Sequence, residues 1–210
     1  MSQTKVSRTT PRSRREEYSE STRSALVSSA LELFSEGGYP ATSLDAIAAS
    51  ARVTKGALYH HFPGGKKSIF EAAFDQIERD VHHRLTALIE SESDPWDAAR
   101  TALRVFLDIC LEPVYRRLVW QEAPHVLGMA AWWDCEQRYG LGLIASLMEK
   151  LMDAGVIERL PVVPLARTVS GALAGAAATM NESDDPLRVR ADFELVISRM
   201  LKGLAPTQPV

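Results

Sequence analysis

The sequence predicts an all-α protein, with a three-helix N-terminal domain and a larger C-terminal domain of further helices. Apolar residues recur three or four positions apart through most of the 210 residues, as they do along one face of a helix. No stretch of any length alternates apolar and polar residues, which is the pattern of a half-buried strand. We expect about nine helices, divided into a flexible arm (residues 1–20), a first domain (21–67) and a second domain (68–205).

The arm has no apolar periodicity and is rich in serine, threonine and basic residues, namely Lys5, Arg8, Arg12, Arg14 and Arg15. A segment of this composition buries too little apolar surface to fold alone, so we expect it to be flexible. The first helix is predicted from Arg23 to Phe34, because Leu26, Ala30 and Leu33 share one stripe with Phe34.

Two short helices joined by a tight turn are predicted between residues 42 and 67. Thr42, followed by Asp45 three positions later, is a capping-box pattern that starts a helix from about residue 43 to residue 51. Thr54 can cap a second helix, in which Leu58 and Phe62 share the packed face. Because the turn is short, the second helix must cross the first at a steep angle.

The other face of the second helix has residue types that suit DNA. Lys55, Gly56, Tyr59 and His60 supply a cation, a position without a side chain and two flat hydrogen-bonding rings. A helix in the major groove needs these properties to reach phosphates and base edges. The alternative is a piece of ordinary core, but residues 59–61 cannot all be buried on one helix. The segment therefore predicts a helix-turn-helix motif.

The charge distribution agrees with a nucleic-acid partner for the first domain. The formal net charge is −3, but residues 1–67 hold ten basic and six acidic residues, a net +4. The remaining residues hold 14 and 21, a net −7. The cation surplus thus accompanies the motif. Two interpretations of the arm stay open, a segment that follows the DNA minor groove and a solvated leader.

From Thr22 to Asp80 the sequence resembles the TetR (tetracycline repressor) family of one-component transcriptional regulators. The likeness is carried by the first helix, Gly37-Gly38-Tyr39, Thr42-Ser43, Ile47-Ala48, the run from Val53 to Phe62, and Lys66. It implies an all-helical dimer with the second motif helix in the major groove. It assigns DNA contacts to Thr42, Ser43, Lys55, Gly56, Tyr59, His60 and Lys66, and we add Arg52 and Thr54 in the turn. Pro63-Gly64-Gly65 is one residue longer than the family's commonest form, which leaves the phosphate contact open between Lys66 and Lys67.

The rest of the chain is interpreted as consecutive helices. Apolar residues from Ile69 to Ile89 predict one long helix that links the two domains. Asp94-Pro95 starts the next helix, which Pro113 ends or kinks. We then expect a short helix over 116–121, an irregular piece over 124–128, a long helix over 130–154 and two C-terminal helices.

The two C-terminal helices have the composition of a dimer interface. Small residues over 170–178 allow another helix to approach closely, and apolar residues at core spacing follow over 193–204. We expect a four-helix bundle with two helices from each subunit, and the alternative is a contact within one chain. The predicted interface residues are Ser170, Gly171, Ala174, Gly175, Ala178, Phe193, Ile197, Met200 and Leu201.

Aromatic and polar residues in the middle of the chain can form a pocket for a small-molecule effector. The candidates are Phe106, Cys110, Trp120, His125, Met129, Trp133 and Tyr139. His125, next to Pro124, is the strongest polar candidate, although a structural role is the alternative. Residues 122–143 also resemble the C-terminal domain of one TetR subgroup, which implies no particular ligand.

Other classes of function have little support. Neither Cys-x-x-Cys nor His-x-x-x-His spacing is present, so no metal site and no cofactor is predicted. No phosphate loop or nucleophile elbow indicates an enzyme. There is no apolar run of about 18 or more residues and no signal-peptide pattern, and two cysteines make no disulfide framework, so we expect a cytoplasmic protein without a membrane span.

These observations lead to one hypothesis about function. The chain is expected to be a homodimeric repressor that occupies a palindromic operator and leaves it when a small molecule binds the second domain. The alternative is a ligand-binding or assembly module that has lost specific DNA binding, against which the basic reading face argues.

Overall fold

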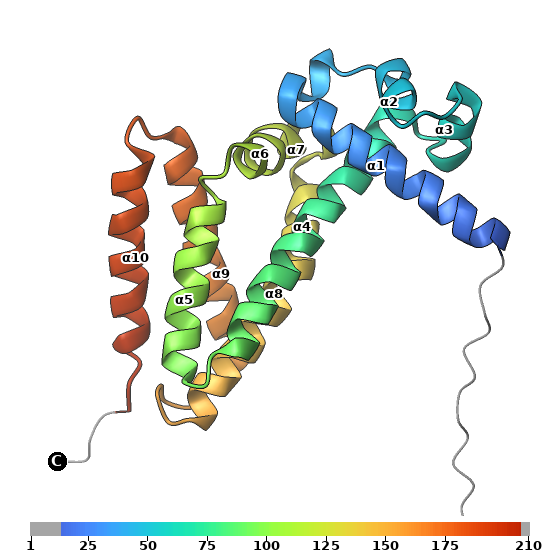
Figure 1. Cartoon of the computed structure of the whole chain (residues 1–210). Coiled ribbons are helices and arrows are strands. Elements are labelled where there is room, and N and C mark those ends of the chain that lie inside the picture. The colour runs from blue at the N-terminus through green and yellow to red at the C-terminus, as the bar shows by residue number, and fades with distance from the viewer. Residues whose placement is uncertain (1–13, 207–210) are drawn as a thin grey trace, which may run out of the picture.

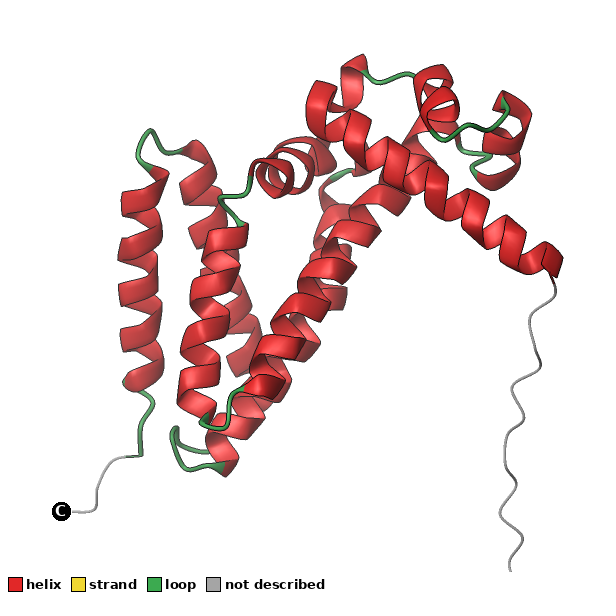
Figure 2. Ribbon diagram, viewed as in Figure 1, coloured by secondary structure: helices red, strands yellow, loops and turns green. Residues whose placement is uncertain are grey.

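The structure is a computed structural model that describes residues 14–206, and every regular element in that range is a helix (Figure 2). The first three helices are α1 (Arg14–Ala41), α2 (Leu44–Ser50) and α3 (Lys55–His61). α1 packs against α2 and against α4 (Gly65–Ser91), and α2 packs against α3. α4 runs down into the second domain (Figure 1). The all-α prediction, with an N-terminal helix-turn-helix and a helical C-terminal domain, is confirmed.

The second domain surrounds the lower part of α4. Its elements are α5 (Pro95–Ile109), α6 (Pro113–Tyr115), the π-helix η1 (Arg116–Glu122), α7 (Ala123–Leu127), α8 (Met129–Asp153), α9 (Val162–Glu182) and α10 (Pro186–Lys202). α4 packs against α5 and α8, and α10 packs against α5 and α9. α10 thus forms one outer edge of the molecule, far from α3 (Figure 1).

One apolar core extends through both domains. It includes Phe34 of α1 and Phe70 of α4, whose rings meet edge to face at 5.3 Å. It continues through Leu85 and Leu107 to Leu151 of α8. The two domains therefore share one continuous packed interior.

The first helix begins at Arg14 and not at Arg23, so the expectation of a flexible arm is wrong for residues 14–20. Arg-Arg-Glu-Glu at 14–17 consists of residue types with high helix propensity. Apolar periodicity is not needed there because this end of α1 projects away from the core (Figure 1). Residues 1–13 of the expected arm lie outside the described residues.

The cap of α2 also differs from the prediction. Ser43, and not Thr42, is the N-cap, and its hydroxyl accepts a hydrogen bond from the Ala46 N–H at 3.1 Å. The Thr42 hydroxyl is turned inward, where it donates to the carbonyls of Leu33 and Gly38 at 3.1 and 2.9 Å. The pattern placed the cap one residue early because both residues carry a hydroxyl.

Residues 116–127 are more regular than predicted. The short helix is a π-helix, and the expected irregular piece at 124–128 is helical up to Leu127. Pro124 lies in the first turn of α7, where the amide hydrogen that proline lacks would have no helical partner.

α9 bears on the sequence-based exclusion of a membrane span. An 18-residue window of this helix has a mean hydropathy of 1.2, and only 17% of that window is buried. By length and composition alone, α9 therefore qualifies as a possible span, as core helices of water-soluble proteins also do. The apolar surface of α9 is thus mostly exposed within the single chain.

Candidate DNA-reading surface and effector cavity

The reading face of α3 is exposed because the opposite face is fixed in the core. Leu58 is fully buried and Phe62 is 3% exposed, and the Thr54 hydroxyl caps the helix by accepting from the Ala57 N–H at 3.2 Å. The other face carries the four predicted reading residues, all of them exposed: Lys55, Gly56, Tyr59 and His60. Tyr59 is 45% exposed, unusually high for a large aromatic side chain.

Lys55 is held by an ion pair on the surface. Its Nζ lies 2.7 Å from Oδ1 of Asp45 on α2, and both side chains are more than half exposed. The hydrogen bond that Lys55 donates to Asp45, together with the negative charge of Asp45, raises the pKa of Lys55, so the amine stays protonated. An exposed pair of this kind is weak, which leaves Lys55 able to exchange Asp45 for a DNA phosphate or base.

The turn before α3 places Arg52 at the surface in the left-handed conformation, with φ of 55°. Ser43 and Thr54 are exposed beside it, although both hydroxyls also cap helices. Thr42 is only 6% exposed, so its side chain does not reach the surface with the others.

The two lysines at the start of α4 differ in their surroundings. Lys66 is half-buried, donates to the Pro40 carbonyl at 3.2 Å and lies 4.4 Å from the ring centre of Tyr39. It therefore ties α4 to the end of α1. Lys67 is exposed.

His61 differs from its neighbour His60 in being half-buried. Burial lowers its pKa, and the charges of His60 and Arg23 lower it further. The Arg23 guanidinium lies 5.1 Å from the ring centre of Phe62, so α1 covers this end of α3. Of the run 59–61, two side chains face solvent and one turns toward the core, as the helical geometry requires.

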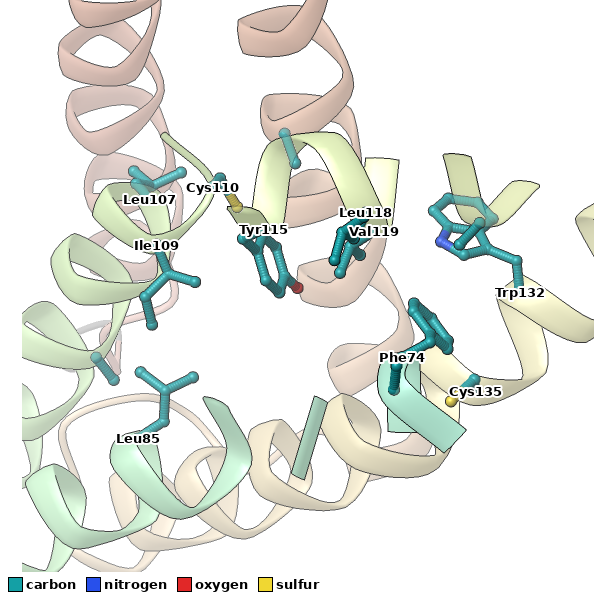
Figure 3. Close-up of a cluster of buried hydrophobic side chains, with 14 of the residues drawn as sticks. Phe74, Leu85, Leu107, Ile109, Cys110, Tyr115, Leu118, Val119, Trp132 and Cys135 are labelled. Atoms are coloured by element: carbon teal, nitrogen blue, oxygen red, sulfur yellow. The ribbon is translucent and has the colours of Figure 1, made fainter. Parts of the chain in front are cut away.

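The second domain contains an apolar cavity that encloses about 120 Å³ between α4, α5, α8, α9 and α10, with Tyr115 and Trp120 closing one side. Four of the seven predicted pocket residues line it, namely Phe106, Trp120, Trp133 and Tyr139. Figure 3 shows Tyr115 directing its hydroxyl inward from the segment above α4 and α8. The cavity is comparable in size with the roughly 150 Å³ space that admits one benzene ring.

The structure does not bring the other three predicted residues, Cys110, His125 and Met129, to the cavity. The His125 side chain is exposed and its Nδ1 lies 2.8 Å from the Gln121 carbonyl, so it contacts the helix backbone on the outside of the molecule. Met129 is 64% exposed at the start of α8, and Cys110 is buried at the end of α5. His125 was favoured because a helix break was expected there, and no break exists.

Glu78, which was not predicted as a site residue, lines the cavity from α4 and is only 5% exposed. Burial raises the pKa of its carboxyl to about 7, against a hydrogen bond from Tyr115 that lowers it, and the charge of Asp75 raises it. A signal was present, because a glutamate at this position interrupts the apolar stripe between Phe74 and Val81.

A second group of polar contacts joins the cavity wall to the first domain. Arg117 of η1 donates to the carbonyls of Ser35 and Glu36 on α1, at 3.0 and 3.1 Å. Glu122 accepts from the Tyr39 N–H, at 3.0 and 2.9 Å to its two oxygens. We call these contacts the α1–η1 latch.

The predicted interface residues on α9 and α10 divide into two groups. Gly171, Gly175 and Met200 are exposed, and Ala178 and Phe193 are half-buried. Ile197 and Leu201 are buried and line the cavity. Ser170 and Ala174 are half-buried and also line it. Ile197 and Leu201 therefore belong to the chain's own core, because they lie on the inner face of α10.

An exposed basic reading helix, joined through one core and a polar latch to an apolar cavity, defines a ligand-binding transcriptional regulator. Sequence comparison supports this class over most of the chain. The family described as bacterial regulatory proteins, tetR family, matches residues 26–73, and the tetracyclin repressor-like C-terminal domain matches residues 96–204. The chain belongs to the TetR family.

Individual proteins agree with this assignment. The Transposon Tn10 TetC protein of Escherichia coli is 30% identical over 143 residues, which are 68% of this chain and 72% of TetC. A TetR-family transcriptional regulator from Pectobacterium atrosepticum is 35% identical and superposes with a TM-score of 0.81, over 93% of this chain and 99% of that one. RolR, solved with the ligand resorcinol, shares the fold at 18% identity, with a TM-score of 0.69 over 93% of this chain and 97% of RolR.

Proposed function

We propose that this chain is a homodimeric repressor that binds a palindromic operator through α3 and is released when a small molecule occupies the cavity. The observation that carries the proposal is the exposed face of α3, with Lys55, Gly56, Tyr59 and His60 on the outside and Leu58 in the core. Such a dimer places its two reading helices on successive turns of DNA, roughly 34–36 Å apart. The setting is the cytoplasm, where the operator is.

The residues around α3 take different roles in this proposal. Arg52, Ser43 and Thr54 are exposed beside the reading face and contact the DNA backbone. Thr42 holds the connection between α1 and α2 from inside through its two hydrogen bonds. Lys67 makes the phosphate contact, because Lys66 is engaged with Pro40 and Tyr39.

The proposed dimer interface is the open face of α9 and α10. On α9, Gly171 and Gly175 are exposed, and a Cβ placed on either glycine would meet nothing within 4 Å in the same chain. On α10, Val196 and Met200 are 51% and 52% exposed. Small residues beside exposed apolar ones allow two helices of a partner subunit to pack closely. This interface also accounts for an apolar α9 that is mostly unburied within one chain.

Communication between cavity and operator uses two routes in the proposal. α4 carries both the cavity-lining residues Glu78 and Leu85 and the packing residue Phe70 beneath α1. The α1–η1 latch provides the second route, since Trp120 lies in the cavity wall between Arg117 and Glu122. A coupling of about 1–3 kcal/mol through these routes lowers operator affinity by roughly 5- to 150-fold.

The test is to select bound fragments from sheared genomic DNA of the host at near-physiological salt. Enrichment of one palindrome with half-sites about one helical turn apart supports the regulator and identifies the neighbouring genes. Weak, salt-sensitive binding to all fragments, with no enrichment, favours the second candidate, a ligand-binding or assembly module without specific DNA binding.

A further inference from the structure

Two hydrogen-bonding atoms in the cavity wall have no partner among the residues that the structure describes. Among the described residues, buried side-chain atoms without a hydrogen bond belong to Glu78, Thr86, Trp120 and Trp132. Glu78 and Trp120 also line the cavity. Glu78 Oε1 is an acceptor and Trp120 Nε1 is a donor. Buried polar groups in folded proteins are nearly always paired, so each of these two atoms needs an explanation.

No lysine or arginine in the cavity wall lies opposite Glu78. The lining residues include no lysine or arginine, and their ionisable side chains are Glu78, His82, Tyr115 and Tyr139. Tyr115 donates to the Glu78 carboxylate without satisfying Oε1. His82 directs Nδ1 to the Tyr139 carbonyl at 3.0 Å.

The nearest charged groups outside the wall are paired with one another. Asp75, one turn before Glu78 on α4, accepts from the Tyr139 hydroxyl and from Arg79, and Arg138 of α8 lies 3.9 Å from it. Asp75 adds negative charge near Glu78 and does not satisfy it. The cavity is therefore apolar, slightly acidic and short of one hydrogen-bond donor.

We propose that the effector is a ring-sized, largely apolar molecule whose hydroxyl or protonated amine donates a hydrogen bond to Glu78 Oε1, and that anions are rejected. This inference rests on the proposed role of the cavity as the effector site. Trp120 Nε1 supplies the complementary donor to an acceptor atom of the same ligand. The rings of Phe106, Trp120 and Trp133 provide flat apolar contact for its body.

An anion is rejected for two reasons. It would place a second negative charge beside the Glu78 carboxylate, and it would have to leave water for a cavity without a lysine or arginine. A purely apolar ring fits the volume but leaves Glu78 Oε1 unpaired. Donor-bearing rings should therefore bind more tightly than either.

The test titrates the full-length protein with phenol, benzylamine, benzoate and toluene at about pH 8, where a carboxyl with a pKa of about 7 is ionised. Binding is followed by tryptophan fluorescence, since Trp120 and Trp133 line the cavity. Phenol or benzylamine is expected to bind at least about tenfold more tightly than toluene, with no binding of benzoate. A preference for benzylamine identifies an ammonium ligand, and a preference for phenol identifies a neutral donor.

Variants assign the selectivity to named atoms. Glu78→Gln, which keeps the side-chain shape, should weaken the preferred probe by about tenfold or more and leave toluene unchanged. Trp120→Phe, which keeps an aromatic ring but removes the N–H, should weaken the preferred probe several-fold. Glu90→Gln, an exposed change on the same helix, is the matched control and should leave all four affinities unchanged.

Benzoate or toluene binding as tightly as phenol and benzylamine overturns the proposal, and so does unchanged selectivity in both Glu78→Gln and Trp120→Phe. The absence of binding by all four probes at millimolar concentration overturns it as well. Operator binding, measured without any probe, is a separate readout: its absence contradicts the proposed function, and its presence together with failed selectivity contradicts only the inference about Glu78.

Discussion

The carboxylate of Glu122 accepts the backbone N–H of Tyr39, at 3.0 Å to Oε1 and 2.9 Å to Oε2. This contact spans 83 positions of sequence and connects the π-helix beside the cavity to the end of α1, next to the reading motif. Gly38 is part of the same contact, because its φ of 78° turns the chain so that the Tyr39 N–H points at Glu122. A π-helix is an uncommon element that is often found at functional sites.

Gly38→Ala is expected to destabilise the protein by about 1–3 kcal/mol, because a Cβ at this φ is strained. That Cβ would also lie 2.6 Å from Glu122 Oε1. The measurement is the free energy of unfolding from urea denaturation. Gly37→Ala is the matched control: a Cβ at this position meets Ala41 Cβ at 3.7 Å and Thr42 Oγ1 at 4.0 Å, both ordinary contacts, so alanine there should stabilise α1 by roughly 0.5–1 kcal/mol. Equal effects of the two changes would show that the latch does not constrain Gly38.

Glu122→Gln should weaken the communication between cavity and operator more than it weakens operator binding itself. Glutamine keeps one oxygen for the Tyr39 N–H but loses the charge beside Arg117, whose Nε lies 3.9 Å from Oε1. The measurement is the ratio of operator dissociation constants with and without a cavity ligand. We expect this ratio to fall toward one. Glu36→Gln, an exposed change on α1, should leave it as in the unmodified protein; a fall in both variants alike would point to a general loosening of α1.

Tyr59→Ala should cost about 1–3 kcal/mol of affinity for the specific operator and little for random DNA, because Tyr59 stands on the reading face. Lys67→Ala should weaken binding to both and reduce the salt slope by about one, as expected for loss of one phosphate contact. Both are measured by titration of operator and random duplexes over a range of salt. Tyr59 has no role in base reading if Tyr59→Ala weakens binding to both duplexes equally.

The helix-turn-helix was predictable because its determinants are local. The Thr54 cap and the buried pair Leu58 and Phe62 act within a single helix, so their spacing in the sequence fixes which face is exposed. The long helix α4 was predictable for the same reason, because the spacing of its apolar residues from Ile69 to Ile89 is a local property of the sequence.

The cavity and the latch depend on contacts between distant parts of the chain. Glu78 was not predicted because Tyr115 and Trp120, which line the cavity with it, come from other elements, α6 and η1. Glu122 was assigned no role because its partner Tyr39 is 83 positions away. His125 was chosen on a local signal, a proline, whose effect depends on its place in the helix. Pairing between distant elements cannot be read from periodicity alone.

Gly175→Leu should convert the proposed dimer to a monomer. A leucine at this exposed position meets nothing within 4 Å of its Cβ in the same chain, so the fold of the single subunit accommodates it. The side chain instead fills the space that the partner's helix needs. Light scattering measures the mass in solution. Gly142→Leu, at an exposed and equally open glycine of α8, is the control and should leave the mass unchanged. A dimer that survives Gly175→Leu would place the interface elsewhere.

The raised pKa of Glu78, about 7, predicts that the protein loses stability as pH rises from about 5 to about 8. Between about pH 5 and pH 7 the folded carboxyl mostly keeps its proton, which it loses as the pH passes its pKa, whereas the unfolded one, with an ordinary pKa near 4.5, has already lost it. The folded state therefore binds more protons, and raising the pH favours unfolding.

Glu78→Gln removes this contribution, so the variant should gain stability relative to the unmodified protein as pH rises, by an amount on the order of 3 kcal/mol at most. Urea denaturation at about pH 5 and about pH 8 measures the free energy of unfolding of the variant and of the unmodified protein. Subtracting one protein's pH dependence from the other's cancels the titration of all groups that the substitution leaves unchanged. Glu90→Gln should show no such pH-dependent gain. If Glu78→Gln also shows none, then Glu78 is ionised throughout this range and its negative charge is stabilised by the fold.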